Sequence, residues 1–307
     1  MGDCVRHLSS KLLIAGVALG AVSANADALA AEPAIPRAVI SDPPSDPQHL
    51  PRMIVAPMPT GGTPIPAMFY TAADTGKHPT IVLFTGMPGA ETNNDLIYAI
   101  RRAGWNVVAF HYRGSWGSAG KFSLSHCIED GSAAVAWLRN PGPEIAPFVD
   151  PNRIVVAGHS FGGWLAGYTA AHDPMIIGAA MISAADMAIP PDTPRADLAK
   201  YLDSWVHVGG MQLLDAKAED LADEALRNGA GWDLSKMADA LARHPLLVVT
   251  ANDGLAPADD AIAAAVAAKP GAQLTKVHFE TNHGYNDKRI ALAGALVAWL
   301  QGQRSER

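Results

Sequence analysis

Six β-rich runs, most of them apolar at nearly every position, alternate along the chain with helical stretches. The runs span residues 80–85, 106–112, 153–158, 178–183, 246–250 and 273–279. An uninterrupted apolar run is typical of a strand that is covered on both faces, whereas a half-exposed strand alternates between apolar and polar residues. The stretches with helical character lie at 93–103, 126–139, 162–172, 257–268 and 287–300. This order predicts a layered α/β domain with a largely parallel sheet.

Two segments depart from this order. Residues 31–66 contain ten of the 23 prolines, which favours an extended leader, with edge strands near 52–55 and 67–71. Residues 186–244 favour helices and offer no strong strand, so we expect a helical cap inserted over one end of the sheet. The predicted organisation is a Pro-rich leader at 31–66 and an α/β domain at 67–307, with the cap at about 186–244.

The first 30 residues have the pattern of a secretory signal peptide. Arg6 and Lys11 make a basic start, an apolar run follows at 12–24, and Ala30 ends an A-x-A sequence. The run is short for a membrane span, although an N-terminal anchor would begin in the same way. Cleavage after Ala30 would leave Cys127 as the single cysteine, which cannot form an intrachain disulfide. We expect a secreted or periplasmic protein with no stable membrane insertion after cleavage.

Composition excludes several classes of protein. Apolar residues make up 49% and charged residues 17% of the 307 residues, enough for a large buried core and unlike a disordered chain. The net charge is −7, and no run of Lys and Arg is longer than two, so we expect no nucleic-acid partner. The sequence has no H-x-x-x-H, no C-x-x-C and no phosphate-binding loop. We therefore expect neither a metal nor another cofactor.

Gly158-His-Ser160-Phe-Gly162 is the chain's single G-x-S-x-G sequence, and it joins the run at 153–158 to the helical stretch at 162–172. A serine at a sharp turn from strand to helix presents its hydroxyl at the carboxyl edge of the sheet. Glycines two residues before and after it allow the strand and the helix to approach closely. The alternative is an ordinary glycine-rich turn. The position between a buried strand and a helix favours Ser160 as a nucleophile.

A serine hydroxyl needs a base that accepts its proton. Asp253 and His283 each follow a predicted strand downstream of Ser160, in the chain order expected for an acid and a base on this kind of sheet. We predict that His283 is the general base and then the acid, and that Asp253 holds the tautomer of the ring and stabilises its charge. Asp186, beyond the run at 178–183, is an alternative acid.

Charge that develops on an attacked carbonyl oxygen needs hydrogen-bond donors. One predicted donor is the backbone N–H of Phe161, directly after the serine. The second is the backbone N–H of Met87, in the loop Gly86-Met-Pro-Gly89 that follows the run at 80–85. The alternative for this loop is a plain turn.

These motifs resemble the α/β-hydrolase superfamily. Within it, residues 149–164 (VDPNRIVVAGHSFGGW) and 112–118 (YRGSWGS) are similar to the catalytic domain of the prolyl oligopeptidase family and its stand-alone esterase relatives. The similarity extends from about residue 80 to residue 300. It implies a mostly parallel sheet of about eight strands flanked by helices, with a triad of Ser160, Asp253 and His283.

The sequence departs from this family at the loop after the first strong strand. Thr85 stands where a histidine is usual, and no tyrosine follows to complete an oxyanion hole of the peptidase type. These departures weaken the case for a true peptidase. Arg113 is a candidate contact for a substrate carboxylate, although an internal ion pair that steadies its loop is the favoured interpretation.

The function we predict is a serine hydrolase that cleaves a small carboxylic ester, or a short peptide or amide, through an acyl-Ser160 intermediate. The alternatives are a serine exopeptidase of the prolyl oligopeptidase type and an inactive binding protein on the same fold. The sequence makes no prediction of an oligomeric state. Apolar side chains of the cap are candidates for an acyl pocket, with packing onto the sheet as their alternative: Trp205, Met211, Leu213, Leu214, Trp232 and Met237.

Overall fold

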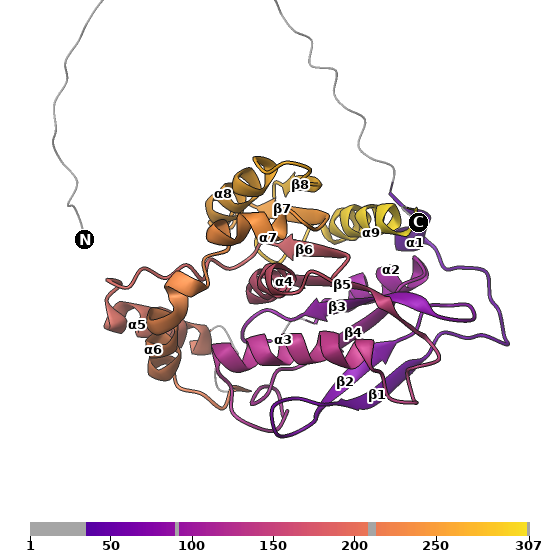
Figure 1. Cartoon of the computed structure of the whole chain (residues 1–307), viewed down its shortest axis with the longest axis horizontal. Helices are drawn as coiled ribbons and strands as arrows, with labels where there is room; N and C mark the ends of the chain where they lie inside the picture. Colours follow the sequence, from indigo (N-terminus) through magenta and orange to yellow (C-terminus); the bar gives the residue numbers. More distant parts are fainter. Residues whose placement is uncertain (1–34, 90–91, 208–212, 306–307) are drawn as a thin grey trace, which may run out of the picture. The chain divides into compact units, whose positions relative to one another are not determined.

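The computed structural model describes residues 35–89, 92–207 and 213–305 (Figure 1). The predicted signal peptide at 1–30 lies outside the described residues. Within them, eight strands form one sheet in the order β1-β2-β4-β3-β5-β6-β7-β8. The strands are β1 (Met53–Met58), β2 (Ile65–Tyr70), β3 (His78–Phe84), β4 (Asn106–Phe110), β5 (Val149–His159), β6 (Gly178–Ile182), β7 (Leu246–Ala251) and β8 (Leu274–Phe279).

The sheet is antiparallel only at one edge. β1 pairs with β2, and β2 with β4, in antiparallel orientation, whereas all pairs from β4 to β8 are parallel. The central strands are buried along most of their length, because helices cover both faces. The expected α/β fold with a mostly parallel, eight-stranded sheet is confirmed.

Helices cover the sheet on both sides and enclose two apolar cores (Figure 1). α2 (Asn94–Arg102) and α9 (Arg289–Ser305) enclose one core, and the short α1 (Arg37–Ile40) packs against both of these helices. α3 (Leu124–Arg139), α4 (Phe161–His172) and α8 (Ala256–Ala267) enclose the other. Both layers of helices leave the carboxyl ends of the parallel strands at one edge, where loops can carry functional groups.

The sheet begins earlier than the predicted domain boundary at residue 67. β1 lies inside the Pro-rich segment at 31–66, and its side chains alternate between exposed and buried in the second half of the strand. Pro57 in β1 lies opposite Pro66 in β2. Proline is tolerated here because β1 is the outermost strand and has an unpaired side. The edge strands expected near 52–55 and 67–71 correspond to β1 and β2, which pair with each other and belong to the sheet.

The segment between β6 and β7 contains helices and no strand of the sheet among its described residues, and a stretch without regular structure at 183–194 precedes the first helix. The segment contains α5 (Arg195–His207), α6 (Ala218–Asn228), the 3-10 turns η2 (Gly229–Gly231) and η3 (Leu234–Met237), and α7 (Ala238–Leu241). α5 and α6 lie side by side (Figure 1, left). Leu198 and Leu202 of α5 and Leu221 of α6 are buried and join the core that α3 and α4 enclose. This is the insertion that we expected to form a cap.

Candidate active site

Ser160 stands at the sharp turn where β5 ends and α4 begins. Its backbone has φ 59° and ψ −125°, a region that residues other than glycine rarely occupy and that costs about 1–3 kcal/mol. The surrounding hydrogen bonds hold this conformation. The Ser160 N–H donates to the Ile182 carbonyl at 2.9 Å, and its own carbonyl accepts from the N–H groups of Gly163 and Trp164.

The two glycines of the motif are needed because the backbone is crowded at this turn. A Cβ atom on Gly158 would lie 2.2 Å from the Gly162 carbonyl oxygen. A Cβ atom on Gly162 would lie 2.3 Å from the Phe84 carbonyl oxygen at the end of β3. The sharp turn that presents Ser160 can therefore close only without side chains at these two positions.

His283 is paired with Asp253. Nδ1 of the ring lies 2.8 Å from Oδ2 of the carboxylate, whose side chain is 2% exposed. Burial opposes ionisation of Asp253, but hydrogen bonds from His283, Ser183 and the Leu255 N–H outweigh it and lower the pKa of the carboxyl. Asp253 is thus a charged acceptor that favours the proton of the ring on Nδ1 and leaves Nε2 unprotonated in the neutral ring.

The alternative acid, Asp186, has a different partner. Its Oδ1 accepts a hydrogen bond from the Ala188 N–H at 2.9 Å, and the side chain is exposed. In the described part of the chain, the carboxylate bonded to the His283 ring is that of Asp253.

Ser160 and His283 line one cavity, but no hydrogen bond joins their side chains among the described residues. Catalytic hydrogen bonds are often loose in a free enzyme and tighten when substrate binds. Of the two contacts that the predicted triad needs, the described structure contains the bond between His283 and Asp253.

Three further residues support His283, and the sequence did not single them out. Nε2 of the buried His159 lies 2.7 Å from the His283 carbonyl oxygen, and the two ring centroids are 4.5 Å apart. Burial and then the charge of His283 lower the pKa of His159 to about 4, so His159 is neutral and donates from Nε2. Behind the loop, the hydroxyls of Ser183 and Tyr285 are 2.7 Å apart. Two of these residues could have been suspected from the sequence, because His159 is next to Ser160 and Tyr285 follows His283 by two residues. No sequence feature pointed to Ser183.

Phe161 and Met87, which carry the two predicted oxyanion donors, both line the cavity beside Ser160. Phe161 is the first residue of α4, where N–H groups have no partner within the helix. Trp116 holds the loop that contains Met87, because its Nε1 donates a hydrogen bond to the carbonyl of the neighbouring Pro88 at 2.6 Å. Both predicted donors thus belong to segments that line the cavity beside Ser160.

The cavity has a volume of about 250 Å³ and lies between the strand ends and the cap. Apart from Ser160, His283, Asp186 and Asp253, the described residues that line it are apolar or aromatic. They are Met87, Leu124, Phe161, Ala185, Met187, Ile189, Leu198, Tyr201, Leu202, Ala225 and Leu255. A larger cavity of about 550 Å³ lies between residues 42–51 and α2, and none of the predicted site residues lines it.

The cap residues proposed for an acyl pocket do not line this cavity where the structure describes them. Leu214 and Trp232 are buried in the core and Leu213 is partly exposed, while Met237 packs against the core. Leu214 and Trp232 are core residues, and Trp232 contacts Trp164 of α4. Met211 and the Trp205 side chain lie outside the described residues. The cavity wall comes instead from α5, α6 and the segment after β6, which the helical pattern of the cap could not specify.

Residues 86–287 match a family described by its alpha/beta hydrolase fold. The chain belongs to the alpha/beta hydrolase family. Its structure is similar to an esterase of Pyrobaculum calidifontis (24% identity, TM-score 0.60, covering 82% of this chain and 86% of that one). It is also similar to EstE1, a thermostable carboxylesterase from a metagenomic library (23%, 0.59, 86% and 92%), and to Est1E from Butyrivibrio proteoclasticus (16%, 0.61, 82% and 99%). No curated protein matches the chain.

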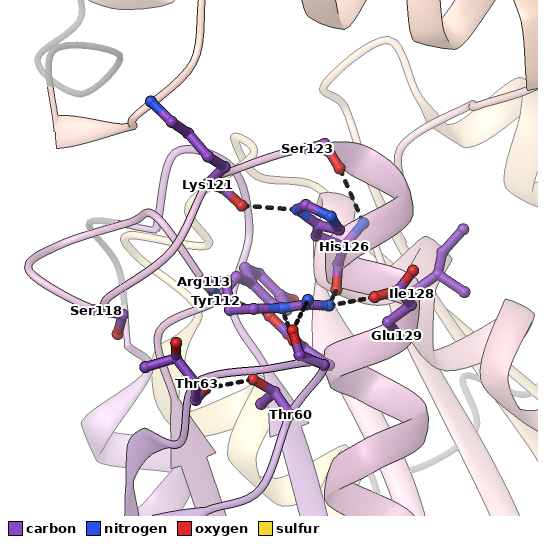
Figure 2. A network of polar contacts seen from close by, with 12 residues as sticks. Thr60, Thr63, Tyr112, Arg113, Ser118, Lys121, Ser123, His126, Ile128 and Glu129 are labelled. Carbon is purple, nitrogen blue, oxygen red and sulfur yellow. Dashed lines mark hydrogen bonds and ion pairs between the residues drawn. The ribbon is translucent and has the colours of Figure 1, made fainter.

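In this alpha/beta hydrolase, Arg113 is an internal ion-pair residue. It is 5% exposed, and Nε lies 2.6 Å from the fully buried Asp130, while Nη2 lies 2.6 Å from Glu129. Nη1 and Nη2 also donate to the carbonyls of Gly61 and His126, and Figure 2 shows the guanidinium directed at α3. Arg113 does not line the site cavity. The favoured interpretation is confirmed, and the role as a substrate contact is not supported.

Among the described residues, no group of three His, Cys, Asp or Glu side chains is arranged to hold a metal ion. Of the helices in the described ranges, none has the length and apolar character that crossing a bilayer requires.

Proposed function

We propose that this alpha/beta hydrolase is a serine carboxylesterase that acts on small esters with an apolar acyl group. The observation that carries the proposal is that three features lie together in one site. The strained Ser160, the bonded pair of His283 and Asp253, and an apolar cavity of about 250 Å³ occupy one place at the carboxyl edge of the sheet. The similar structures include proteins named as an esterase and a carboxylesterase, which supports the same reaction class.

The residues suggest a two-step reaction. Oγ of Ser160 bonds to the ester carbonyl carbon while its proton passes to Nε2 of His283, and Asp253 stabilises the charged ring. The N–H groups of Phe161 and Met87 stabilise the oxygen anion, and one such donor is worth about 3 kcal/mol. The carbon–oxygen bond to the alcohol then breaks, and His283 returns the proton to the leaving alkoxide. Water attacks the acyl-Ser160 ester in the same way and releases the acid and the free serine.

The apolar wall favours esters over peptides. A peptide substrate presents N–H and C=O groups that lose their water on binding and need partners in the site. The described cavity wall provides few such partners besides the triad and Asp186. An apolar acyl chain needs none, and it gains from burial against Leu198, Leu202 and Leu255.

The test is Ser160→Ala, with Ser132→Ala, an exposed serine on α3, as the matched control. We expect Ser160→Ala to lower turnover of p-nitrophenyl butyrate by several orders of magnitude, because the nucleophile is lost while the fold remains. Ser132→Ala should retain wild-type turnover. A fluorophosphonate probe should label the wild type at Ser160.

Other outcomes separate the alternatives. Turnover by Ser160→Ala close to that of the wild type contradicts the assignment of the nucleophile. Faster cleavage of aminoacyl p-nitroanilides than of esters by the wild type favours the exopeptidase. No labelling of a correctly folded wild type favours a binding protein with inactive chemistry.

A further inference from the structure

Glu224, on α6 of the cap, is a buried carboxylate that reaches the first turn of α3. It is 8% exposed, and its two oxygens accept hydrogen bonds from the N–H groups of Leu124 at 2.8 Å and Ser125 at 2.7 Å. The next N–H, that of His126, is satisfied by the Ser123 side chain. The first N–H groups of a helix lack partners within it and favour negative charge. Glu224 therefore joins the cap to a helix that lies 100 residues earlier in the chain.

This contact lies at the wall of the site cavity. Leu124, whose N–H the carboxylate binds, lines the cavity, and so does Ala225, the residue after Glu224. Leu124 is in α3, a helix of the α/β domain, and Ala225 is in α6, a helix of the cap. The separation of these helices at Glu224 therefore decides how wide the cavity is at this point.

The rest of the cap depends on the position of α6. The chain just before α6 is bonded to the domain, because Asp215 N–H donates to the Gly114 carbonyl at 2.7 Å and Trp116 N–H donates to the Leu213 carbonyl at 3.0 Å. α5 packs on α6, to which the exposed pair Arg195–Asp223 also joins it. Exposed ion pairs contribute little to stability. The buried hydrogen bonds of Glu224 are therefore the polar contact that holds α6 against α3.

We propose that Glu224 is a specificity-determining residue that fixes the width of the acyl cavity by anchoring α6 to the start of α3. This inference rests on the proposed esterase function, since the cavity must hold the acyl group. With the carboxylate in place, Leu124 and Ala225 set a limit on the acyl chain. Without it, the N–H groups of Leu124 and Ser125 lose their acceptor, and no other polar contact among the described residues joins α6 to α3.

The substitution Glu224→Ala should extend the range of acyl chains that the enzyme hydrolyses. For acyl chains longer than those that the wild type accepts well, the kcat/KM of Glu224→Ala should exceed that of the wild type. The ratio should grow by about fourfold for each further methylene that the wider cavity buries. Acetate esters, which are too short to reach this wall, should change by no more than about twofold. Glu224→Gln keeps the volume and one acceptor oxygen, so it should shift the profile in the same direction by less.

The experiment measures kcat/KM for p-nitrophenyl esters from acetate to dodecanoate. The variants are Glu224→Ala and Glu224→Gln, with Glu219→Ala, an exposed glutamate on the same helix, as the matched control. Leu124→Ala, which removes the wall directly, gives the reference for a broadened profile. Thermal unfolding of each variant separates a loss of stability from a change of specificity.

The outcomes distinguish this inference from the function on which it rests. A broadened profile for Glu224→Ala and a wild-type profile for Glu219→Ala support it. A Glu224→Ala profile that overlays the wild type, with lowered thermal stability, shows a structural anchor only and overturns it. A wild type that hydrolyses no ester and is not labelled by the phosphonate overturns the proposed function first. If Glu224→Ala does not fold, the profile of Glu224→Gln decides.

Discussion

Asp253 is the residue whose charge the proposed chemistry needs most. Its hydrogen bonds lower the pKa of the carboxyl in spite of burial, so it stays ionised at neutral pH and holds Nδ1–H of His283. Asparagine at this position can donate to the ring from its amide nitrogen, which favours the wrong tautomer and takes the base away from Ser160. The bond between these two side chains is thus a requirement for the chemistry, beyond any contribution to stability.

We predict that Asp253→Asn lowers kcat for an activated ester by about ten-thousandfold, as loss of the triad acid does in other serine hydrolases. Asp186→Asn is the matched control and should change kcat by less than about threefold, because that side chain bonds to Ala188 N–H and is exposed. Steady-state kinetics on folded protein measure both. A larger loss of kcat for Asp186→Asn than for Asp253→Asn would show that Asp186 is the acid of the triad.

At the scale of elements, the junction of β5 and α4 decides whether the nucleophile is presented. Three segments meet there, because Gly158, Gly162 and the end of β3 at Phe84 approach within van der Waals contact. No rotamer change can relieve a clash between backbone atoms. A side chain at this junction must displace either the strand or the helix.

Gly162→Ala should therefore destabilise the protein by several kcal/mol, at the upper end of the range for single substitutions. A Cβ atom there would lie 2.3 Å from the Phe84 carbonyl oxygen. Gly302→Ala in α9 is the control, since an added Cβ meets no atom of the described residues within 4 Å and alanine favours a helix by up to about 1 kcal/mol. Urea unfolding should show opposite signs for the two substitutions. Equal midpoints would show that the junction is less crowded than these contacts require.

Local composition predicted most directly the strands whose burial is complete, and it also predicted the partly exposed β8 from the run at 273–279. The runs at 153–158 and 246–250 became β5 and β7 because strands covered on both faces need apolar residues throughout. The meeting of Asp253 with His283 followed from topology, since parallel strands end at one edge. The edge strand expected near 52–55 became β1, but its extension through Pro57 was not predicted, because proline is allowed there by the strand's outer position, which depends on the whole sheet. The contacts of Glu224 join segments 100 residues apart, and no local pattern encodes them.

At the scale of the whole molecule, stability and the site are linked by a buried acid. Asp259, in the first turn of α8, is 1% exposed. One oxygen accepts the Ala184 N–H at 2.9 Å, and the other has no partner among the described residues. Burial raises the pKa of this carboxyl to about 8, and the nearby charge of Asp253 adds to the effect. Asp259 is therefore protonated at neutral pH and holds the segment after β6 that lines the cavity.

This protonation gives the stability of the protein a definite pH dependence. The carboxyl has a pKa of about 8 in the folded protein and about 3.9 when unfolded. Between these values the folded state keeps a proton that the unfolded state has released, so rising pH favours unfolding. The free energy of unfolding should fall by about 1.4 kcal/mol for each pH unit from this group alone, and the fall should end above pH 8.

Asp259→Asn removes this titration while keeping the oxygen that accepts the Ala184 N–H. At about pH 4 the variant and the wild type should have similar stability, and by about pH 8 the variant should be more stable by several kcal/mol. Urea unfolding across this range measures the difference, with Asp192→Asn, an exposed aspartate before α5, as the control that should follow the wild type. Parallel curves for the wild type and Asp259→Asn would mean that Asp259 is already ionised in the folded protein. In that case the segment after β6 would lie beside a buried negative charge, and that charge would raise the pKa of Asp253.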